Sequence, residues 1–274
     1  MGRLGGAVML VCSVLRALII IPARFESIRF PGKPLATLRD KTLVEWAWLG
    51  AKSSQLCQRV LVATDDERIR ATVTAFGGEA VMTPSDCPSG TDRVAHAASK
   101  LDADVIVNVQ ADEPLVTGSS LDRMIEAFQD PAVEAATLRE PFEAAGDLFD
   151  PNQVKVVTAA NGDALYFSRS PIPYRRGKGY LTFDFSAALF ARPTPLEGYW
   201  KHVGVYAYRR DVLLQLARTT PTPLETAESL EQLRLLETGR KIRVLDSDFR
   251  SVGVDTPQEL RRAAQALDER ETKR

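Results

Sequence analysis

Short hydrophobic runs alternate with longer segments of helical periodicity from residue 17 onward. A run such as VIVNV, with almost no polar alternation, is typical of a strand that helices cover on both faces. The pattern therefore predicts βα units that build a mostly parallel sheet. The predicted strands are residues 17–21, 60–63, 80–82 and 105–109, and the predicted helices are 42–54, 67–76, 92–101 and 119–129, with Asp92 and Ser119 as the clearest N-caps.

The pattern changes after Asp150. The segment VKVVTAANGDALYFS places an Asn-Gly turn between two β-rich runs, which predicts an antiparallel hairpin. Residues 171–198 are rich in Pro, Gly, Arg and aromatic residues without a steady period, which is typical of a functional loop. The sequence then predicts a strand at HVGVYAYR, a helix at 224–237, a strand at 242–245 and a closing helix at 256–267.

No internal repeat, low-complexity tract or linker divides the sequence, so we predict a single domain over residues 17–274 with an insertion at 150–210. The first sixteen residues, MGRLGGAVMLVCSVLR, imitate the apolar part of a signal peptide but lack a small-residue cleavage site. They are also too short to span a bilayer. We therefore expect residues 1–16 to be an N-terminal extension, or the product of a start codon upstream of Met9.

The composition of the 274-residue chain, 45% hydrophobic and 26% charged, excludes disordered, collagen-like and coiled-coil proteins. Lys and Arg number 35 against 36 Asp and Glu, so the net charge of −1 provides no general attraction for nucleic acid or a membrane surface. Any anion site must therefore be local. Three cysteines without metal-ligand spacing, and only two histidines, argue against a zinc cluster and predict a reduced, cytoplasmic protein.

A cationic loop, IIIPARFESIRFPGKPL, follows the first predicted strand and carries Arg24, Arg29 and Lys33. Loops at the carboxyl ends of parallel strands line the ligand crevice, so these cations lie where a phosphate-rich ligand would bind. Neither a Walker A sequence nor GxGxxG follows the strand, which argues against a P-loop NTPase and a dinucleotide dehydrogenase. A solvated basic loop is the alternative interpretation.

Two acidic residues provide a candidate metal site. VNVQADEP places Asp112 at the end of the fourth predicted strand, where a carboxylate can hold Mg²⁺ against substrate phosphates. Asp255 in SVGVDTPQEL is the second acid. Its position before Thr256 and Pro257 fits an ordinary helix N-cap equally well, so both interpretations stay open.

The segment TPSDCPSGTDR forms a loop of small hydroxyl residues before a helix. Its backbone N–H groups and the Ser89 and Thr91 hydroxyls can hold a base and a ribose, although plain turns have the same composition. Cys87 has no nearby histidine to activate it, so we do not expect covalent catalysis.

Polar residues farther along the chain can bind a polyhydroxylated acid. Arg169 and His202 suit a carboxylate, whereas Glu231 and Gln232 suit hydroxyl groups, with Tyr206 in the strand between them. Taken singly, each of these residues is more often a surface residue.

Taken in order, the motifs resemble those of the 3-deoxy-manno-octulosonate (Kdo) cytidylyltransferase family, from about residue 17 to VGVDTPQEL. The resemblance implies a Rossmann-like α/β nucleotidyltransferase fold, a mixed, mostly parallel sheet flanked by helices, with a smaller antiparallel insertion for substrate or dimer contacts. It implies Mg²⁺ as cofactor, CTP and Kdo as substrates, CMP-Kdo and pyrophosphate as products, and a role in lipopolysaccharide biosynthesis. It also implies a homodimer, with no nucleic-acid partner and no stable membrane association.

The same resemblance assigns residues to roles by motif. Arg24, Lys33 and Asp112 are implied to be catalytic, and Asp112 and Asp255 to be metal ligands. The implied nucleotide-binding residues are Pro22, Ala23, Arg24, Lys33, Ser89, Gly90, Thr91, Arg93 and Gln110. The implied sugar-acid residues are Arg169, His202, Tyr206, Glu231 and Gln232.

The sequence departs from the family pattern at two motif positions. Cys87 stands where many members have histidine, and Ala111 stands where glycine is usual, while the stretch 175–198 is longer than usual. An 8-amino derivative of Kdo or a relative of sialic acid remains an alternative substrate. A glycosyltransferase and a non-catalytic nucleotide-binding regulator are the alternative classes. Arg24 and Lys33 argue against the glycosyltransferase, which needs no cationic loop for a departing pyrophosphate. A regulator would keep that loop but need not place two acids on separate elements to hold a metal.

Overall fold

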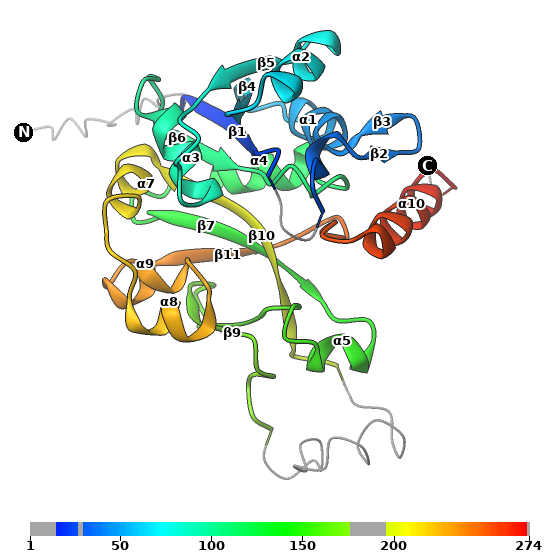
Figure 1. Ribbon diagram of the computed structural model, residues 1–274. Helices are drawn as coiled ribbons and strands as arrows, with labels where there is room; N and C mark the ends of the chain where they lie inside the picture. Colours follow the sequence, from blue (N-terminus) through cyan, green and yellow to red (C-terminus); the bar gives the residue numbers. More distant parts are fainter. Residues whose placement is uncertain (1–14, 27–29, 176–195, 273–274) are drawn as a thin grey trace, which may run out of the picture.

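A fully buried strand, β1 (Ala17–Ala23), lies inside a nine-stranded mixed sheet in the computed structural model, which describes residues 15–26, 30–175 and 196–272 (Figure 1). The main path of the sheet runs β11-β7-β10-β6-β1-β4-β5. Besides β1, the strands of this path are β4 (Cys57–Thr64), β5 (Glu79–Met82), β6 (Val105–Asn108), β7 (Ala135–Pro141), β10 (Trp200–Arg209) and β11 (Ile242–Asp246).

The sheet combines parallel and antiparallel pairing. β5, β4, β1 and β6 are parallel neighbours, as are β7 and β11, whereas β10 runs antiparallel between β6 and β7. The hairpin of β8 (Lys155–Thr158) and β9 (Ala164–Ser168) joins β10 through the pair Lys155 and Lys201. This confirms the expected mixed sheet, and the antiparallel hairpin falls inside the predicted insertion at 150–210.

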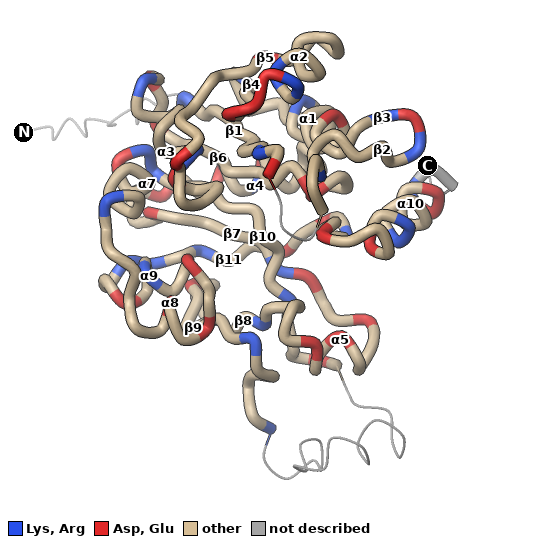
Figure 2. Tube along the Cα trace, viewed as in Figure 1, with Lys and Arg blue, Asp and Glu red and all other residues tan. Residues whose placement is uncertain are grey.

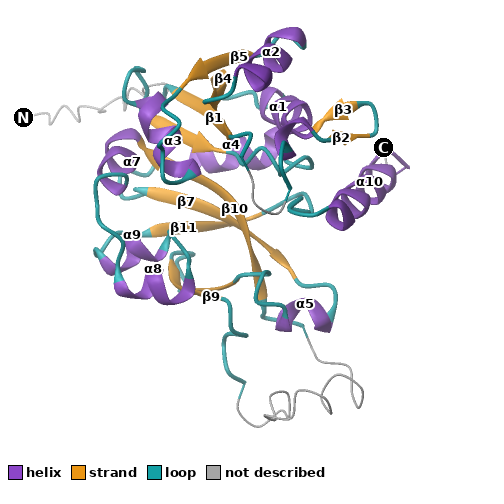
Figure 3. Ribbon diagram, in the orientation of Figure 1, coloured by secondary structure: helices purple, strands orange, loops and turns teal. Residues whose placement is uncertain are grey.

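Helices cover both faces of the sheet, as Figure 3 shows. Side chains alternate across a strand, so Ile19 and Ile21 of β1 enter one core while Leu18 and Ile20 enter the other. The first core also contains residues of α1 (Leu43–Lys52), α2 (Glu67–Ala75), α4 (Gly118–Ala127) and α10 (Pro257–Thr272). The second contains residues of α3 (Gly90–Ala98), α7 (Arg210–Leu216) and α9 (Leu233–Glu237).

The remaining described elements are short and lie between the larger ones. They are the 3-10 helix η1 (Lys33–Leu35), the two-stranded sheet of β2 (Thr37–Leu38) and β3 (Lys41–Thr42), α5 (Ala145–Phe149) and α8 (Pro223–Glu228). Apart from α8, which falls within the helix predicted at 224–237, the sequence did not predict these elements, nor β7 and α7. Every strand that it did predict is confirmed.

Three local predictions are wrong. Ser89 and Thr117, not Asp92 and Ser119, are the N-caps of α3 and α4, because their hydroxyls accept the backbone N–H three residues later. The helix predicted at 224–237 is two helices, α8 and α9. Ser229 separates them, since its φ of 51° lies in the left-handed region that a helix interior does not use.

Charged residues of both signs are interspersed along the described chain (Figure 2), in keeping with the net charge of −1. No helix among the described residues is both long enough and apolar enough to cross a membrane. The predictions made for residues 1–14, for Arg29 and for most of the stretch 175–198 lie outside the described residues.

Candidate active site

A cavity of about 360 Å³ lies where β1 and β6 end, at the carboxyl edge of the parallel strands. Eleven residues are predicted from the sequence to serve catalysis, nucleotide binding or metal binding, and all but Thr91 line this cavity. Its lining consists of Pro22, Ala23, Arg24, Lys33, Pro34, Cys87, Ser89, Gly90, Arg93, Gln110, Ala111, Asp112 and Asp255.

Lys33 reaches the cavity from the first turn of η1. The preceding Gly32 has a φ of 70°, and a Cβ added there would lie 3.2 Å from the Phe25 ring, so the turn requires glycine. From this turn Lys33 Nζ donates a hydrogen bond to Asp112 Oδ2 and another to Asp255 Oδ1, the latter at 2.8 Å. One cation thus joins two carboxylates that come from distant parts of the sequence.

The two carboxylates favour the ionised form of Lys33. Burial by itself lowers the pKa of the Lys33 ammonium, but the charges and hydrogen bonds of Asp112 and Asp255 outweigh burial and raise the pKa above its ordinary value. The ammonium is therefore held as a cation between two anions.

Asp112 and Asp255 fit a divalent cation because both carboxylates already converge on one positive charge. Mg²⁺ prefers hard oxygen ligands and is often held by one or two carboxylates, with phosphate and water oxygens completing the shell. The described residues include no cluster of three or more His, Cys, Asp or Glu side chains suited to a metal. These two carboxylates therefore suit a metal ion that a phosphate ligand also binds, rather than one that protein side chains alone surround.

The structure answers the question of whether Asp255 is a helix cap. Thr256, not Asp255, has the position of the N-cap of α10, because its hydroxyl accepts the Glu259 N–H at 3.3 Å. The Glu259 carboxylate accepts the Asp255 N–H at 2.8 Å and the Thr256 hydroxyl at 3.0 Å, which fixes the chain as it enters the helix. The Asp255 carboxylate is thus not used as the cap and contacts Lys33.

The start of α3 forms another wall of the cavity. Ser89 is the N-cap, and the Asp92 carboxylate returns to the Ser89 N–H at 3.1 Å. A Cβ added at Gly90 would lie 3.4 Å from the Pro22 side chain, so the loop approaches β1 closely. Thr91 is buried beneath this turn, where its hydroxyl accepts from the Asn108 amide at 3.5 Å.

Arg93 lines the cavity, but its guanidinium is buried and already bonded. It donates to Asp65 at 2.8 Å, to the Pro84 carbonyl at 3.3 Å and to the Thr83 hydroxyl. Arg93 thereby fixes the loop before α3. Gln110 lies opposite and donates to Asn108 at 3.0 Å.

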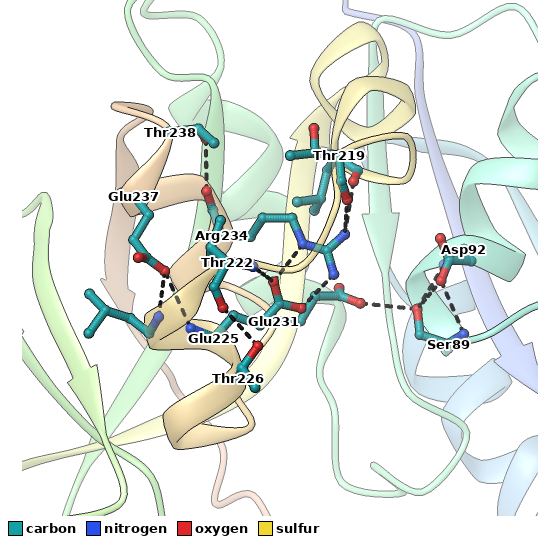
Figure 4. A network of polar contacts seen from close by, with 12 residues as sticks. Ser89, Asp92, Thr219, Thr222, Glu225, Thr226, Glu231, Arg234, Glu237 and Thr238 are labelled. Carbon is teal, nitrogen blue, oxygen red and sulfur yellow. Dashed lines mark hydrogen bonds and ion pairs between the residues drawn. The ribbon is translucent and has the colours of Figure 1, made fainter.

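A hydrogen bond connects the nucleotide-side loop to the α8–α9 region. In Figure 4, Ser89 Oγ points toward Glu231, and the distance to Glu231 Oε2 is 3.0 Å. Burial raises the pKa of Glu231, although its hydrogen bonds with Thr91 and Ser89 oppose the shift. Next to it, the buried pair of Arg234 and Glu225 joins α9 to α8.

The residues assigned to the sugar acid lie on β9, β10 and the α8–α9 junction, and only His202 lines either of the two cavities described here. The Arg169 guanidinium donates to the carbonyls of Glu228, Pro151 and Ser229 at 2.6, 2.9 and 3.1 Å. Three of its five N–H groups are therefore used inside the protein. Gln232 is buried, and its side-chain Nε2 has no hydrogen-bond partner among the described residues.

His202 and Tyr206 lie together on β10 with ring centroids 5.4 Å apart. His202 Nε2 is 2.9 Å from the Thr137 hydroxyl, and burial lowers the pKa of the imidazole to about 3. Burial also raises the pKa of Tyr206. Both side chains are consequently neutral near pH 7 and do not exchange protons readily there.

A second cavity, of about 820 Å³, shares Asp255 with the first and extends toward α5. Its lining includes three buried residues that the sequence analysis did not assign, Glu113, Glu140 and Ser251. Burial raises the pKa of Glu113 to about 7. Glu113 adjoins Asp112 in the motif VNVQADEP, which was its signal in the sequence, whereas Glu140 lies on the unpredicted strand β7.

The two departures from the family pattern fit their surroundings. Among the described non-glycine residues, only Arg39 and Ser229 have a positive φ, so Ala111 takes the place of glycine without left-handed strain. Cys87 lines the first cavity, and burial raises the pKa of its thiol. A protonated thiol is a poor nucleophile.

Comparison with known proteins identifies the class to which this fold and site belong. Residues 18–242 match the cytidylyltransferase family. A cytidylyltransferase from Leptospira borgpetersenii, 15% identical with a TM-score of 0.59 over 93% of this chain and 87% of that one, shares the fold. The chain is therefore a member of the cytidylyltransferases.

More similar proteins narrow the assignment. The 3-deoxy-manno-octulosonate cytidylyltransferase of Pelobacter propionicus is 47% identical, with 89% of this chain and 94% of the relative covered. That of Myxococcus xanthus is 48% identical, with 89% and 94% covered. A solved CMP:2-keto-3-deoxy-manno-octonic acid synthetase in complex with CTP is 41% identical, with a TM-score of 0.81 over 93% of this chain and 99% of that one. The chain belongs to the 3-deoxy-manno-octulosonate cytidylyltransferase family.

Proposed function

We propose that this protein transfers CMP from CTP to Kdo, forming CMP-Kdo and pyrophosphate for lipopolysaccharide biosynthesis. The observation that carries the proposal is the cavity at the end of β1, which the cations Arg24 and Lys33 line together with Asp112 and Asp255. Cations suit the triphosphate and carboxylates suit its metal ion, while the full-length similarity to enzymes of this name supports the choice of substrates.

Positioning and charge neutralisation account for most of the catalysis in such transfers. Arg24 and Lys33 would bind the β- and γ-phosphates and neutralise the charge of the leaving pyrophosphate. Gly90 and the first N–H groups of α3 would approach the nucleotide closely, with Ser89 and Thr91 beside it. The hydroxyl on the anomeric carbon of the sugar acid would then attack the α-phosphorus in line with the leaving group.

We propose Asp112 and Asp255 as the ligands of Mg²⁺, since their carboxylates meet at one cation. When bound, the ion screens the α-phosphate and lowers the pKa of the attacking hydroxyl. Lys33 would leave the two carboxylates for the phosphates as CTP binds. His202 would remain a neutral hydrogen-bonding group, because its pKa of about 3 makes it a poor proton acceptor.

We propose that the sugar acid lies between β10 and the α8–α9 junction. Arg169 has two further Nη–H groups for the sugar carboxylate beyond the three N–H groups that bind carbonyls. Gln232, with its unpartnered Nε2, and Glu231 would bind hydroxyl groups. His202 and Tyr206 would form the floor of this site.

We also propose a cytoplasmic homodimer. The described cysteines, Cys57 and Cys87, are free thiols, which suits a reducing compartment. Leu165 on β9 and Tyr174 are large hydrophobic residues with exposed fractions of 62% and 68%, and they lie in the segment expected to form dimer contacts. Light scattering coupled to size-exclusion chromatography measures the oligomeric state.

Pyrophosphate release measured with CTP, ATP, GTP and UTP against Kdo, 8-amino-Kdo and a sialic acid tests the proposed function. We expect rapid Mg²⁺-dependent release only with CTP and Kdo. Faster release with another sugar acid would transfer the assignment to that substrate. Release with no sugar acid at all, or CMP-sugar hydrolysis in its place, would contradict the proposed reaction.

A further inference from the structure

Ser251 is buried and connects the loop before α10 to the sheet. Its exposed fraction is 7%. Its backbone N–H donates to Glu140 Oε2 at 3.0 Å, its hydroxyl donates to Glu113 Oε1 at 2.7 Å, and its carbonyl accepts from Lys201 Nζ at 2.8 Å. Lys201 and Glu140 also form an ion pair at 2.7 Å. Three side chains from β7, β10 and the β6 loop therefore fix one serine.

Ser251 and its partner Glu113 are close in the sequence to the two proposed metal ligands. Glu113 directly follows Asp112 in the chain, and Ser251 begins the segment SVGVD that ends at Asp255. A backbone hydrogen bond from Val254 N to Asp112 O, at 3.1 Å, joins the two loops a second time. A shift of Ser251 would consequently move Asp255 relative to Asp112.

We propose that Glu113 and Ser251 form a tether that positions the Asp112 and Asp255 carboxylates for one divalent cation, an inference that rests on the proposed metal site. Neither tether residue touches the cation. Buried groups that orient metal ligands commonly change metal affinity 10–100-fold when they are removed. Two ligands on separate loops depend on such connections, because Lys33 no longer holds the two carboxylates together once it has left them.

Two substitutions of Glu113 separate the effect of its hydrogen bond to Ser251 from the effect of its charge. Glu113→Gln keeps a side-chain oxygen that accepts the Ser251 hydroxyl, whereas Glu113→Met keeps the length and removes the acceptor. Ser251→Ala removes the donor from the other side. We expect Glu113→Met and Ser251→Ala to weaken Mn²⁺ binding by about tenfold or more, and Glu113→Gln by less than about threefold.

The measurement is Mn²⁺ binding to nucleotide-free protein, followed by the electron paramagnetic resonance signal of free Mn²⁺, together with thermal melts. Asp122→Ala is the matched control, since its carboxylate accepts the Gln55 and Leu56 backbone N–H groups far from the cavity. This variant should lose thermal stability while binding Mn²⁺ like the wild type.

Asp112→Asn and Asp255→Asn distinguish the tether from the metal site itself. If neither change weakens Mn²⁺ binding, the proposed metal site is wrong. If both weaken binding but Ser251→Ala and Glu113→Met bind Mn²⁺ like the wild type, only the tether is wrong. Equal damage from Glu113→Gln and Glu113→Met would show that the charge of Glu113 matters rather than its hydrogen bond, which also overturns the tether. Should Ser251→Ala fail to fold, the two Glu113 variants still decide the question.

Discussion

Lys33 occupies the place between the carboxylates that a divalent cation would take, so the two cations should compete. The substitution Lys33→Met removes the charge and keeps most of the aliphatic stem. In nucleotide-free protein it removes the ammonium that contacts both the Asp112 and the Asp255 carboxylates. We therefore expect nucleotide-free Lys33→Met protein to bind Mg²⁺ or Mn²⁺ more tightly than the wild type.

The expected gain follows from the exposure of the three groups. The exposed fractions of the side chains are 17% for Lys33, 22% for Asp112 and 40% for Asp255, so solvent screens both ion pairs in part. Partly exposed pairs contribute up to about 1 kcal/mol each, which gives about 1–2 kcal/mol for the two together. Since about 1.4 kcal/mol corresponds to a tenfold change in affinity, the cation should bind roughly 5–30-fold more tightly.

Turnover should change in the opposite direction. With CTP and Kdo, loss of the ammonium that neutralises the leaving phosphates should lower turnover by at least ~10²-fold. Isothermal titration with Mg²⁺ measures the first effect and pyrophosphate release the second, while a thermal melt confirms folding. Lys41→Met, which removes a lysine paired with Asp40 in the β2–β3 turn, is the control for net charge. Unchanged or weaker metal binding in folded Lys33→Met protein would refute the competition.

Three further predictions concern binding, pH and packing. Arg169→Ala should raise the KM for Kdo far more than the KM for CTP. It should also lower the melting temperature, because three carbonyls lose their hydrogen-bond donor. Equal effects on both KM values would show that Arg169 has only a structural role. His202 has a folded pKa of about 3, below its unfolded value, so the unfolded chain binds more protons and stability falls as pH drops below about 6.5. The stability difference between wild type and His202→Gln should shift by about 2 kcal/mol against the wild type from pH 7 to pH 5 in urea titrations, and a constant difference would contradict the buried neutral imidazole. Gly118→Ala places a Cβ 2.3 Å from the Ser53 backbone, so it should destabilise the protein by about 1–3 kcal/mol. Gly146→Ala should not, because no atom of the described residues lies within 4 Å of the added Cβ. Similar melting temperatures for the two variants would show that the close approach at Gly118 is relieved at no cost.

Predictions of individual elements succeeded where neighbouring residues alone decide the structure. The runs that form β1, β4 and β6 are apolar in themselves, and the Asn-Gly turn between β8 and β9 specifies its own hairpin. β7 was missed because its sequence, AATLREP, ends in charged residues. Glu140 is buried there against Lys201 of the neighbouring strand β10 and the Ser251 N–H, partners that no local pattern shows.

The candidate site likewise has features that the sequence predicts and contacts that only the tertiary structure shows. The sequence by itself determined which loops carry the cations and carboxylates, because each motif directly follows an apolar strand or precedes a helix. Only the tertiary structure decided that Asp255 joins Lys33 and Asp112 while Thr256 caps α10, since both residues suit a cap locally. Only the tertiary structure revealed the contact of Ser251 with Glu113. A hydrophobic pattern depends on residues that lie a few positions apart in the sequence. The charge of a carboxylate instead acts on any residue that the fold brings within a few ångströms, however far away that residue is in the sequence.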